Sequence, residues 1–522
     1  MKGAIAAGHP LTAQAGADVL EAGGNAFDAC LAAAFVSWVT ESPLTGPASG
    51  GFLLAHRAAE PGRDELLDFF VAAPGRALDR DGRAEMVSVD VEFSPGNVQV
   101  FRIGAASCAV PGAVRGLAEA HRRYGTLPWA DLLRPAIDVA RAGVELNEAQ
   151  ALVHAILDPV LRYGAESRRM YGEACALAVG ERIPLDDLAD TLEWLAAEGA
   201  DVFYEGELAD RISACVLEDG GRLTTTDLAS YQVVQRTPVR ADFRDHAFVS
   251  NPPPSSGGIL IAFALGVLER LRVDAPAGSA EAVSAVAAAM REATNARSGS
   301  FAADLHGDGL AERLLAPERL AEAARAASEP LRTATPERAR SPSTTHISVV
   351  DADANAASLS ASTGCGSGIV VPGTGIHLNN MLGEEDLNPD GSHAEPGARL
   401  TSMMAPSVVV RDGRPRLVLG SAGSIRLRAA ILQLVVNAVQ HGMSAGEAVD
   451  APRVHLEGER RLHLEGGFDP AAAEALEAAG YDVVPWGERN LYFGGASCVA
   501  LADGRLEAAG DPRRGGAGVV VG

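Results

Sequence analysis

Lysine is almost absent from this chain of 522 residues, because Lys2 is the only one. Without a lysine in the body of the chain, neither the phosphate-binding lysine of a P-loop nor a lysine that forms a Schiff base with a cofactor is available. Positive charge is scarce as well: 44 lysine and arginine residues stand against 68 aspartate and glutamate residues, for a net charge of −24. This balance argues against nucleic acid or an anionic membrane as a partner.

Closely spaced cysteines and long apolar runs are also missing. The six cysteines lie far apart, with no C-x-x-C pair and no cluster of cysteine and histidine, so we expect reduced thiols and no zinc site. No metal and no other cofactor is expected. The longest apolar run near the N-terminus, Ala29 to Val39, is too short to cross a bilayer, and no signal-peptide pattern precedes it. We therefore expect a cytoplasmic protein.

Apolar spacing and turn residues predict that the first part of the chain is rich in helices. Residues 10–41 are expected to form two helices, with Gly23-Gly24 between them and Asn25 as the cap of the second. The glycine-rich segment 46–51 lacks the lysine of a phosphate loop and is interpreted as a tight turn before a strand at Phe52–Ala55. Further helices are predicted at Gly116–Tyr124, Trp129–Ala142, Leu185–Glu198, Ile259–Leu271 and Ala280–Ala296.

The pattern changes beyond residue 320. Residues 321–343 are rich in Ala, Arg, Pro and Ser without apolar periodicity, which predicts an exposed linker. Alternation over 346–350 and 356–360 predicts two strands joined by a turn. More strands are expected at Ser407–Val410 and Leu417–Leu419, and a helix from about Ala429 to His441. Helices outside two packed sheets are consistent with this order of elements.

A threonine stands where the expected linker meets the first of these strands, in Ser343-Thr344-Thr345-His346. Its hydroxyl can attack the preceding carbonyl and convert the Ser343–Thr344 amide into an ester that water opens. The new N-terminal Thr344 would then combine a nucleophilic hydroxyl with its own α-amine as the base, since an α-amine titrates near ~8. Taken alone, the motif is better explained by β-branched residues opening a strand, and His346 by a structural role rather than a catalytic one.

Other motifs favour the interpretation of Thr344 as a nucleophile over that of a simple strand residue. Their shared order and compatible spacing along the chain are hard to obtain by chance. The motifs are Gly23-Gly24-Asn25-Ala26-Phe27-Asp28-Ala29, Val110-Pro111-Gly112, Tyr124-Gly125-Thr126-Leu127-Pro128-Trp129, Pro253-Pro254-Ser255-Ser256-Gly257-Gly258, Thr344-Thr345-His346-Ile347-Ser348-Val349-Val350-Asp351, Gly375-Ile376-His377-Leu378-Asn379-Asn380, Ser402-Met403-Met404-Ala405-Pro406, Gly420-Ser421-Ala422-Gly423-Ser424 and Asp511-Pro512-Arg513-Arg514. Together they make the chain resemble, along nearly its whole length, the gamma-glutamyltransferase (gamma-glutamyltranspeptidase) family of N-terminal-nucleophile hydrolases.

The resemblance implies an α+β fold with four layers, αββα, made from one precursor that cuts itself between Ser343 and Thr344. Residues 1–343 would form a larger helix-rich subunit ending in the linker. Residues 344–522 would form a smaller β-rich subunit that carries the nucleophile, and the two would interleave as one globular unit. Thr344 takes the place of the family's nucleophile, and Ser362 that of a second hydroxyl residue that could orient it. The backbone amides of the oxyanion hole fall on Gly423 and Ser424, where serine still offers its N–H.

The residues that would bind a glutamyl group depart from the family pattern. Phe70 stands where the family has an arginine that clamps the α-carboxylate, and an apolar ring cannot pair with a carboxylate. A serine pair for the same carboxylate is replaced by Thr401-Ser402, and an asparagine after the second hydroxyl by Gly364. Asn380 is kept, and an acid that could hold the α-amine is still available at Glu384 or Glu385. For Glu384-Glu385-Asp386 an exposed acidic loop is a better explanation than a metal site, because no histidine is nearby. Arg399 and Arg426 are the arginines that could replace the lost cation by position.

These features predict a self-processing amidohydrolase or acyltransferase. It would cleave a small-molecule amide through an acyl-Thr344 intermediate and pass the acyl group to water or an amine, with its own cleaved subunit as partner. Its acyl specificity would be non-standard, with an apolar or amino-bearing acyl chain facing Phe70, because a buried carboxylate without its cation is costly. The alternative is a family relative without turnover that acts as a binding or structural protein. For a third reading, a biosynthetic enzyme acting on a non-amide bond, the sequence gives no positive sign.

Overall fold

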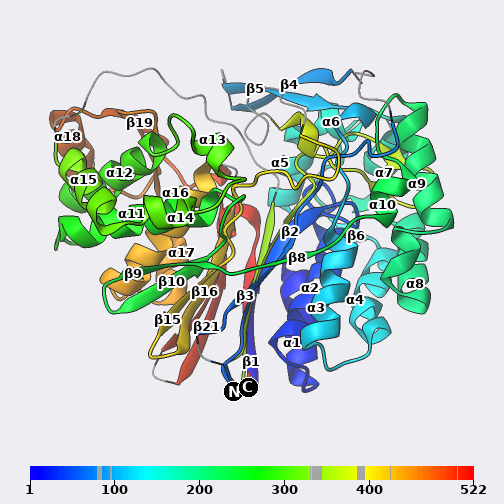
Figure 1. The fold of residues 1–522 in the computed structure, drawn as a ribbon, viewed down its shortest axis with the longest axis horizontal. Helices are drawn as coiled ribbons and strands as arrows, with labels where there is room; N and C mark the ends of the chain where they lie inside the picture. The colour runs from blue at the N-terminus through cyan, green and yellow to red at the C-terminus, as the bar shows by residue number, and fades with distance from the viewer. Residues whose placement is uncertain are drawn as a thin grey trace.

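Two β-sheets face each other in the middle of the molecule, and helices cover the outer face of each (Figure 1). The structure, a computed structural model, describes residues 1–60, 62–78, 85–94, 97–173, 175–329, 331, 344–384, 394–423, 425–502 and 504–522. The N- and C-termini lie side by side at one end, as their strands pair with each other. The α+β fold class with four αββα layers is therefore confirmed.

The first sheet contains, within the described residues, seven strands in the order β22-β1-β11-β12-β2-β3-β8. They are β1 (Gly3–Ala7), β2 (Gly50–His56), β3 (Glu65–Phe69), β8 (Val234–Arg236), β11 (Thr345–Asp351), β12 (Ala356–Ser362) and β22 (Ala517–Val521). Neighbouring strands are antiparallel throughout. Strands from before and after residue 344 thus share one hydrogen-bonded sheet, with β11 and β12 between β1 and β2.

The second sheet has the order β21-β20-β16-β15-β10-β9. Its strands are β9 (Val239–Phe243), β10 (His246–Ser250), β15 (Ser407–Arg411), β16 (Arg414–Ala422), β20 (Gly495–Ala502) and β21 (Arg505–Gly510). Phe52, Val350, Val418 and Val499 belong to the apolar core that fills the space between the two sheets. Smaller ladders are formed by β4 (Val87–Ser94) with β5 (Asn97–Ile103), β6 (Val144–Glu145) with β7 (Arg182–Ile183), β13 (Val370–Val371) with β14 (Ile376–His377), and β17 (Val454–Glu457), β18 (Arg461–Leu464) and β19 (Asp482–Pro485).

The helices divide into two groups, one on each side of the paired sheets (Figure 1). The group beside the first sheet comprises α1 (Pro10–Glu21), α2 (Ala26–Thr40), α3 (Ala113–Tyr124), α4 (Trp129–Ala142), α5 (Glu148–Ile156), α6 (Asp158–Leu161), α7 (Ala165–Tyr171), α8 (Asp186–Glu198), α9 (Glu207–Glu218) and α10 (Thr225–Ala229). The group beside the second sheet comprises α11 (Gly257–Leu271), α12 (Ala280–Asn295), α13 (Phe301–Asp304), α14 (Leu310–Leu314), α15 (Pro317–Ala327), α16 (Ile425–Val435), α17 (Ala445–Asp450) and α18 (Pro470–Ala478).

Helix α2 positions one wall of the site described below. It begins at a capping box in which the Asn25 side chain accepts from the Asp28 N–H and the Asp28 carboxylate accepts from the Asn25 N–H. Every residue of the helix is buried, because α1, α3, α4 and the first sheet surround it. The helix ends at Thr40, and Glu41 follows as its C-cap residue.

Most predicted elements are confirmed, but two expectations are wrong. Residues 321–327 are not linker: they belong to α15, whose buried Leu320, Ala323 and Ala327 lie on one face. Alanine supplies that face, so the periodicity of large apolar residues does not reveal it. The short strands β8, β9 and β10 occur where a mostly helical pattern was expected. The remainder of the expected linker, residues 332–343, lies outside the described residues.

Candidate functional site

Thr344 immediately precedes β11, in the middle of the first sheet. Its exposed fraction is 6%. The register of β11 and β12 pairs Thr345 with Ala361, and its continuation by one residue places Thr344 opposite Ser362. Directly opposed residues of an antiparallel pair carry their side chains on the same face. The two hydroxyl residues predicted from the sequence are therefore cross-strand neighbours.

The alternation along β11 determines which way Thr344 points. The Thr345 hydroxyl donates a hydrogen bond to Glu41 Oε2 at the end of α2, over 2.9 Å. His346 points to the other side, toward the second sheet, where a Cβ on Gly420 of β16 would stand 2.3 Å from His346 Cε1. Because side chains alternate along a strand, Thr344 shares the His346 side and faces the space between the sheets.

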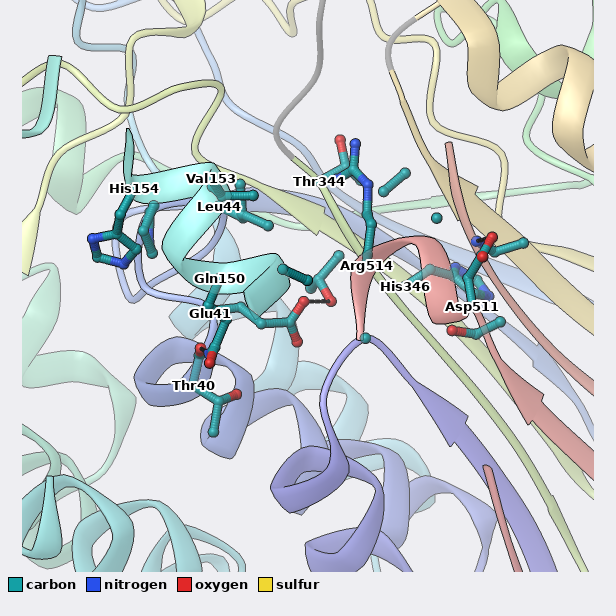
Figure 2. Close-up of a pocket in the computed structure, with 18 residues that line it drawn as sticks. Thr40, Glu41, Leu44, Gln150, Val153, His154, Thr344, His346, Asp511 and Arg514 are labelled. Carbon is teal, nitrogen blue, oxygen red and sulfur yellow. Dashed lines mark hydrogen bonds between the residues drawn. The ribbon is translucent and has the colours of Figure 1, made fainter. Parts of the chain in front are cut away.

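A small pocket with a cavity volume of about 40 Å³ lies beside Thr344. Figure 2 shows that its walls come from segments far apart in the sequence. They are Thr40 and Glu41 at the end of α2, Gln150 and His154 of α5, Thr344–His346, Ala422 at the end of β16, Gly495–Ser497 of β20, and Asp511 and Arg514 near the C-terminus.

Glu41 is a buried acid on one wall of this pocket, with an exposed fraction of 8%. Within the described residues, its Oε2 accepts from Thr345 while its Oε1 has no hydrogen-bond partner. Burial raises the pKa of the Glu41 carboxyl to about 7, although the Thr345 hydroxyl and the charge of Arg514 act in the opposite direction. This carboxyl can therefore exist in either protonation state near neutral pH.

Arg514 supplies a cation on the opposite wall and extends toward Thr344 (Figure 2). It is the last residue of the 3₁₀ turn η6 (Pro512–Arg514), which the Asp511 side chain caps. Its stem passes over Gly495 of β20, where a Cβ would stand 2.3 Å from Arg514 Cδ. Burial and the nearby Arg426 lower the pKa of the Arg514 guanidinium to about 10. A glycine at 495 therefore makes room for a guanidinium beside Thr344.

His346 lies between the sheets, and both nitrogens of its imidazole are within hydrogen-bond distance of serine hydroxyls. Its Nδ1 lies 2.8 Å from Ser360 Oγ and its Nε2 lies 3.0 Å from Ser348 Oγ. Burial lowers the pKa of His346 to about 3, so the ring is neutral at physiological pH. The structural role expected for His346 is confirmed, because a group this hard to protonate is a poor acceptor for a proton from the nucleophile.

Gly364 lies between the Ser362 hydroxyl and the side chains of Asn380 and Glu384. The Ser362 hydroxyl accepts from the Gly364 N–H over 2.9 Å. Gly364 has a φ of 71°, and a Cβ there would stand 2.0 Å from Asn380 Oδ1 and 3.1 Å from Glu384 Oε1. Asn380 therefore occupies the space that a side chain at position 364 would need. Asn380 also accepts from the Cys365 N–H and donates to Cys365 Sγ, and burial raises the pKa of that thiol well above its usual value.

The predicted oxyanion segment begins at the pocket. Ala422 lines the pocket, and Gly423 follows it with a φ of 149°, a conformation that favours glycine. Ser424, Glu385 and Ser343, which were also predicted as site residues, lie outside the described residues.

Phe70 is a core residue rather than a wall of the Thr344 pocket, which corrects the expectation that it faces an acyl chain. Its exposed fraction is 1%, and its ring stacks on Phe52 with the two centroids 5.5 Å apart. Phe70 and Phe52 belong to the same apolar core cluster, and their stacked rings bury apolar surface against each other.

Neither arginine suggested as a replacement cation lines this pocket. The Arg399 guanidinium donates to the carbonyl of Phe70, beside its backbone rather than its ring, and forms an ion pair with Asp68 over 3.3 Å. It also donates to the Tyr231 hydroxyl and the Gln232 carbonyl. Arg426 is buried, with its guanidinium 4.2 Å from the centre of the Tyr492 ring.

Thr401 and Ser402 do not line the pocket either. The Ser402 hydroxyl accepts from the Met404 N–H over 3.0 Å, and the Ser402 carbonyl accepts from the Ser256 N–H over 2.7 Å. Ser255 also donates to this carbonyl. These contacts connect the Ser255-Ser256-Gly257-Gly258 motif to the segment around Ser402 and give Ser402 a structural role in this chain.

Sequence reasoning missed three charged pocket residues, Glu41, Asp511 and Arg514. Arg514 belongs to a tail motif that carried the resemblance, but nothing in its spacing indicates a place beside Thr344. Glu41 follows a predicted helix and is 304 positions from its hydrogen-bond partner Thr345. Among the described residues, no group of three or more His, Cys, Asp and Glu side chains could hold a metal ion, and no helix there is long and apolar enough to cross a membrane.

Comparisons with known proteins agree with this geometry. The profile of the Gamma-glutamyltranspeptidase family matches residues 12–521. The chain is 33% identical to the glutathione hydrolase proenzyme of Escherichia coli (strain K12), over 98% of this chain and 90% of that protein. It is 34% identical to the acylase ACY 1 proenzyme of Pseudomonas sp. (strain SE83), over 100% of this chain and 94% of that protein. Among solved structures, cephalosporin acylase from Bacillus halodurans superposes with a TM-score of 0.84 at 27% identity, covering 99% of this chain and 95% of that one.

Proposed function

The chain belongs to the gamma-glutamyltranspeptidase family, and on that premise we propose that it is a self-processing amidohydrolase or acyltransferase with Thr344 as its nucleophile. The observation that carries the proposal is the position of Thr344. It is buried directly before the central strand β11, the continued register of β11 and β12 places it opposite Ser362, and it lines a pocket. The relatives described as proenzymes support self-cleavage of a precursor.

Self-cleavage would begin with attack of Thr344 Oγ on the carbonyl carbon of Ser343. The C–N bond of that peptide breaks as the C–O bond forms, and the hydroxyl proton passes to the departing nitrogen. Water then hydrolyses the ester, leaving a carboxylate on Ser343 and a free α-amine on Thr344. The cleaved protein would comprise residues 1–343 and 344–522.

Turnover would use the same hydroxyl with the new α-amine as general base. Thr344 Oγ attacks the substrate carbonyl, the α-amine takes the hydroxyl proton and then delivers it to the leaving amine, and an ester to Thr344 remains. Water or a second amine attacks that ester in the same way. Backbone N–H groups at Gly423 and Ser424 are the proposed donors to the negative oxygen of each tetrahedral intermediate.

We also propose that the acyl group is not the standard γ-glutamyl group. The support is that position 70 carries a phenylalanine packed in the core, while Arg399 is already bound to Asp68 and to backbone carbonyls. Relatives described as glutathione hydrolases and as acylases match this chain equally well. Comparison of γ-glutamyl-p-nitroanilide with acyl anilides that lack the α-carboxylate tests this point, and strong turnover of the first alone would contradict it.

The nucleophile is tested on a denaturing gel. Wild-type protein is expected to give two fragments, with mass spectrometry placing the new N-terminus at Thr344. Thr344→Ala is expected to stay intact, because no hydroxyl is left to attack. Thr344→Ser is the matched control, since it keeps the hydroxyl and should still be cleaved.

Two results would decide against the proposal. Cleavage of Thr344→Ala at the same bond would exclude Thr344 as the attacking group. A cleaved wild-type protein that turns over no amide in a broad screen would favour the alternative of a binding or structural relative.

A further inference from the structure

The cation beside the nucleophile lacks an anion of its own. Among the residues that the structure describes, no hydrogen bond or ion pair to the Arg514 side chain is present, and its Nε is buried without a partner. A buried guanidinium usually has carboxylate or carbonyl oxygens around it, because leaving water is otherwise costly. Arg399 also has a buried Nε without a hydrogen-bond partner, but the rest of its guanidinium donates to a hydroxyl and several carbonyls and it forms an ion pair with a carboxylate.

The acids near Arg514 do not neutralise it. Asp511 binds two other arginines, with Oδ2 2.7 Å from Arg453 and Oδ1 3.1 Å from Arg513, and Oδ2 also accepts from the Ala496 N–H. Glu41 faces the same pocket but is within no ion-pair distance of Arg514 among the described contacts, and its hydrogen bond goes to Thr345. Arg426 adds a second positive charge close by. The wall around Arg514 is therefore left positive.

The chain also keeps a space for this side chain. The stem of Arg514 lies against Gly495, and a Cβ there would meet its Cδ at 2.3 Å, its Cγ at 3.0 Å and its Nε at 3.0 Å. Gly495 pairs with Ala422 at the end of β16, next to the proposed oxyanion segment. The guanidinium is thus held in the pocket wall and extends toward Thr344 (Figure 2).

We propose that Arg514 binds a carboxylate of the substrate and so determines specificity for anionic amides. A planar guanidinium with free donors is matched to a carboxylate in charge and in geometry. Glu41 does not oppose this binding, because it can take up a proton as the anion enters. The inference rests on the proposed amidohydrolase function and adds the substrate class. It replaces the expectation of an apolar acyl chain facing Phe70.

Four p-nitroanilides separate the groups of a γ-glutamyl donor. The γ-glutamyl compound has both the carboxylate and the amine, the glutaryl compound only the carboxylate, the 4-aminobutyryl compound only the amine, and the butyryl compound neither. For the cleaved wild-type protein, kcat/KM for glutaryl is expected to exceed that for butyryl roughly 10-fold or more. Arg514→Met should lower this ratio by roughly 10- to 100-fold, the range expected for losing a charged hydrogen bond. Arg514→Lys should give an intermediate ratio.

The carboxylate could also sit on the amine side of the scissile bond. Butyryl amides of 4-aminobenzoate and 4-aminobenzamide differ only in that charge, and a ratio between them that depends on Arg514 would place the carboxylate there. Gly495→Ala is a second variant that displaces the Arg514 stem and should lower the same ratio. Arg411→Met, which removes an exposed arginine paired with Asp245, is the control and should change neither ratio.

Failure of this inference differs from failure of the proposed function. If both charged-to-neutral ratios stay near one in the wild type, or if Arg514→Met and Gly495→Ala slow every substrate equally, carboxylate binding by Arg514 is wrong and the side chain is structural. If the cleaved wild-type protein turns over none of the six amides, the proposed function has failed for this panel. Should Arg514→Met not be cleaved, Arg514→Lys and Gly495→Ala supply the decisive ratios.

Discussion

Glu41 shows at the residue scale how burial changes the chemistry of a single group. Its carboxyl lies at the end of a fully buried helix, and its one hydrogen bond comes from Thr345, the neighbour of the nucleophile. Burial and the unpaired Oε1 leave the ionised form poorly stabilised, although the charge of Arg514 acts in the opposite direction. Near neutral pH the carboxyl of Glu41 is therefore partly protonated, whereas a solvent-exposed glutamate would be ionised.

Glu41→Gln is expected to change how stability depends on pH. Burial raises the pKa of Glu41 to about 7 from an ordinary value of 4.5, so the folded protein holds this proton more tightly than the unfolded chain. Stability from this group is fully present below pH 4.5 and is lost as the pH rises toward 7. The free energy of unfolding of the wild type relative to Glu41→Gln should therefore fall by about 3 kcal/mol between pH 4.5 and pH 8.

Urea denaturation measures this difference most cleanly in uncleaved protein. Both chains would carry Thr344→Ala, so that fragment dissociation does not enter the unfolding reaction. Glutamine can still accept from Thr345, which limits the comparison to the ionisation. An equal free-energy difference at the two pH values would show that Glu41 titrates at its ordinary pKa.

The sequence points to the proposed nucleophile more readily than to the residues around it. The resemblance alone assigns the roles of Thr344 and Ser362, and the register of β11 and β12 in the structure then places the two residues opposite each other. Gly364 could be identified as a departure, but only the structure shows that Asn380 fills its space. Glu41, Gln150 and Arg514 come from three distant segments, and no local pattern brings them together. A place for Phe70 in the substrate site was inferred from the resemblance alone. In the structure its ring packs against Phe52 in the core.

A layer of buried serines around His346 connects elements of both sheets. His346 and Ser348 belong to β11, Ser358 and Ser360 to β12, and Ser348 donates to the Ser497 carbonyl of β20. Ser358 also donates to the Leu419 carbonyl of β16 and accepts from the Ser407 N–H of β15. A neutral imidazole fits this layer, since Nε2 can donate to Ser348 while Nδ1 accepts from Ser360. The hydrogen bonds fix how the strands behind Thr344 pack.

His346→Leu is expected to destabilise the fold without changing the pH profile of turnover. The substitution leaves the hydroxyls of Ser348 and Ser360 without their ring partner, at a cost of about 1–3 kcal/mol for each group. Urea denaturation in the Thr344→Ala background should therefore show a loss of about 2–5 kcal/mol. In cleaved protein the kcat/KM profile between pH 6 and 9 should keep its shape, because the ring is neutral throughout.

The matched control is Ser360→Ala, which removes one hydroxyl of the layer and should cost less than the ring substitution. A pH profile that loses its basic limb in His346→Leu would make His346 a proton-transfer residue. That outcome would contradict the structural role assigned to it here.

Elements with strong periodicity are predictable from this sequence, and elements held by tertiary contacts are not. Helices α4 and α8 begin and end within one residue of the prediction, because large apolar residues recur at helical spacing. Helix α15 buries mainly alanines, and strand β9 alternates charged with buried residues over only five positions. The apolar pattern in such short or alanine-rich segments is weak. Packing against neighbouring elements therefore determines their secondary structure more than their own sequence does.

At the scale of the whole molecule, strands from before and after residue 344 pair with each other in both sheets. In the first sheet, β11 and β12 pair with β1 on one side and β2 on the other, and β22 pairs with β1 at the edge. In the second sheet, β15 pairs with β10. The turn after β11 is tied in as well, because Asp351 accepts from the Ala26 N–H at the start of α2. Cutting the chain before Thr344 breaks none of these ladders.

The cleaved protein is therefore expected to remain one particle under native conditions. Size-exclusion chromatography with light scattering should give a single species containing both fragments in equal amounts, at the mass of the uncleaved Thr344→Ala chain or a whole multiple of it. The fragments should separate only in denaturant, because each would otherwise expose unpaired strand edges and the apolar core between the sheets. Elution of either fragment by itself from native buffer would show that the ladders across the cut do not hold the two parts together.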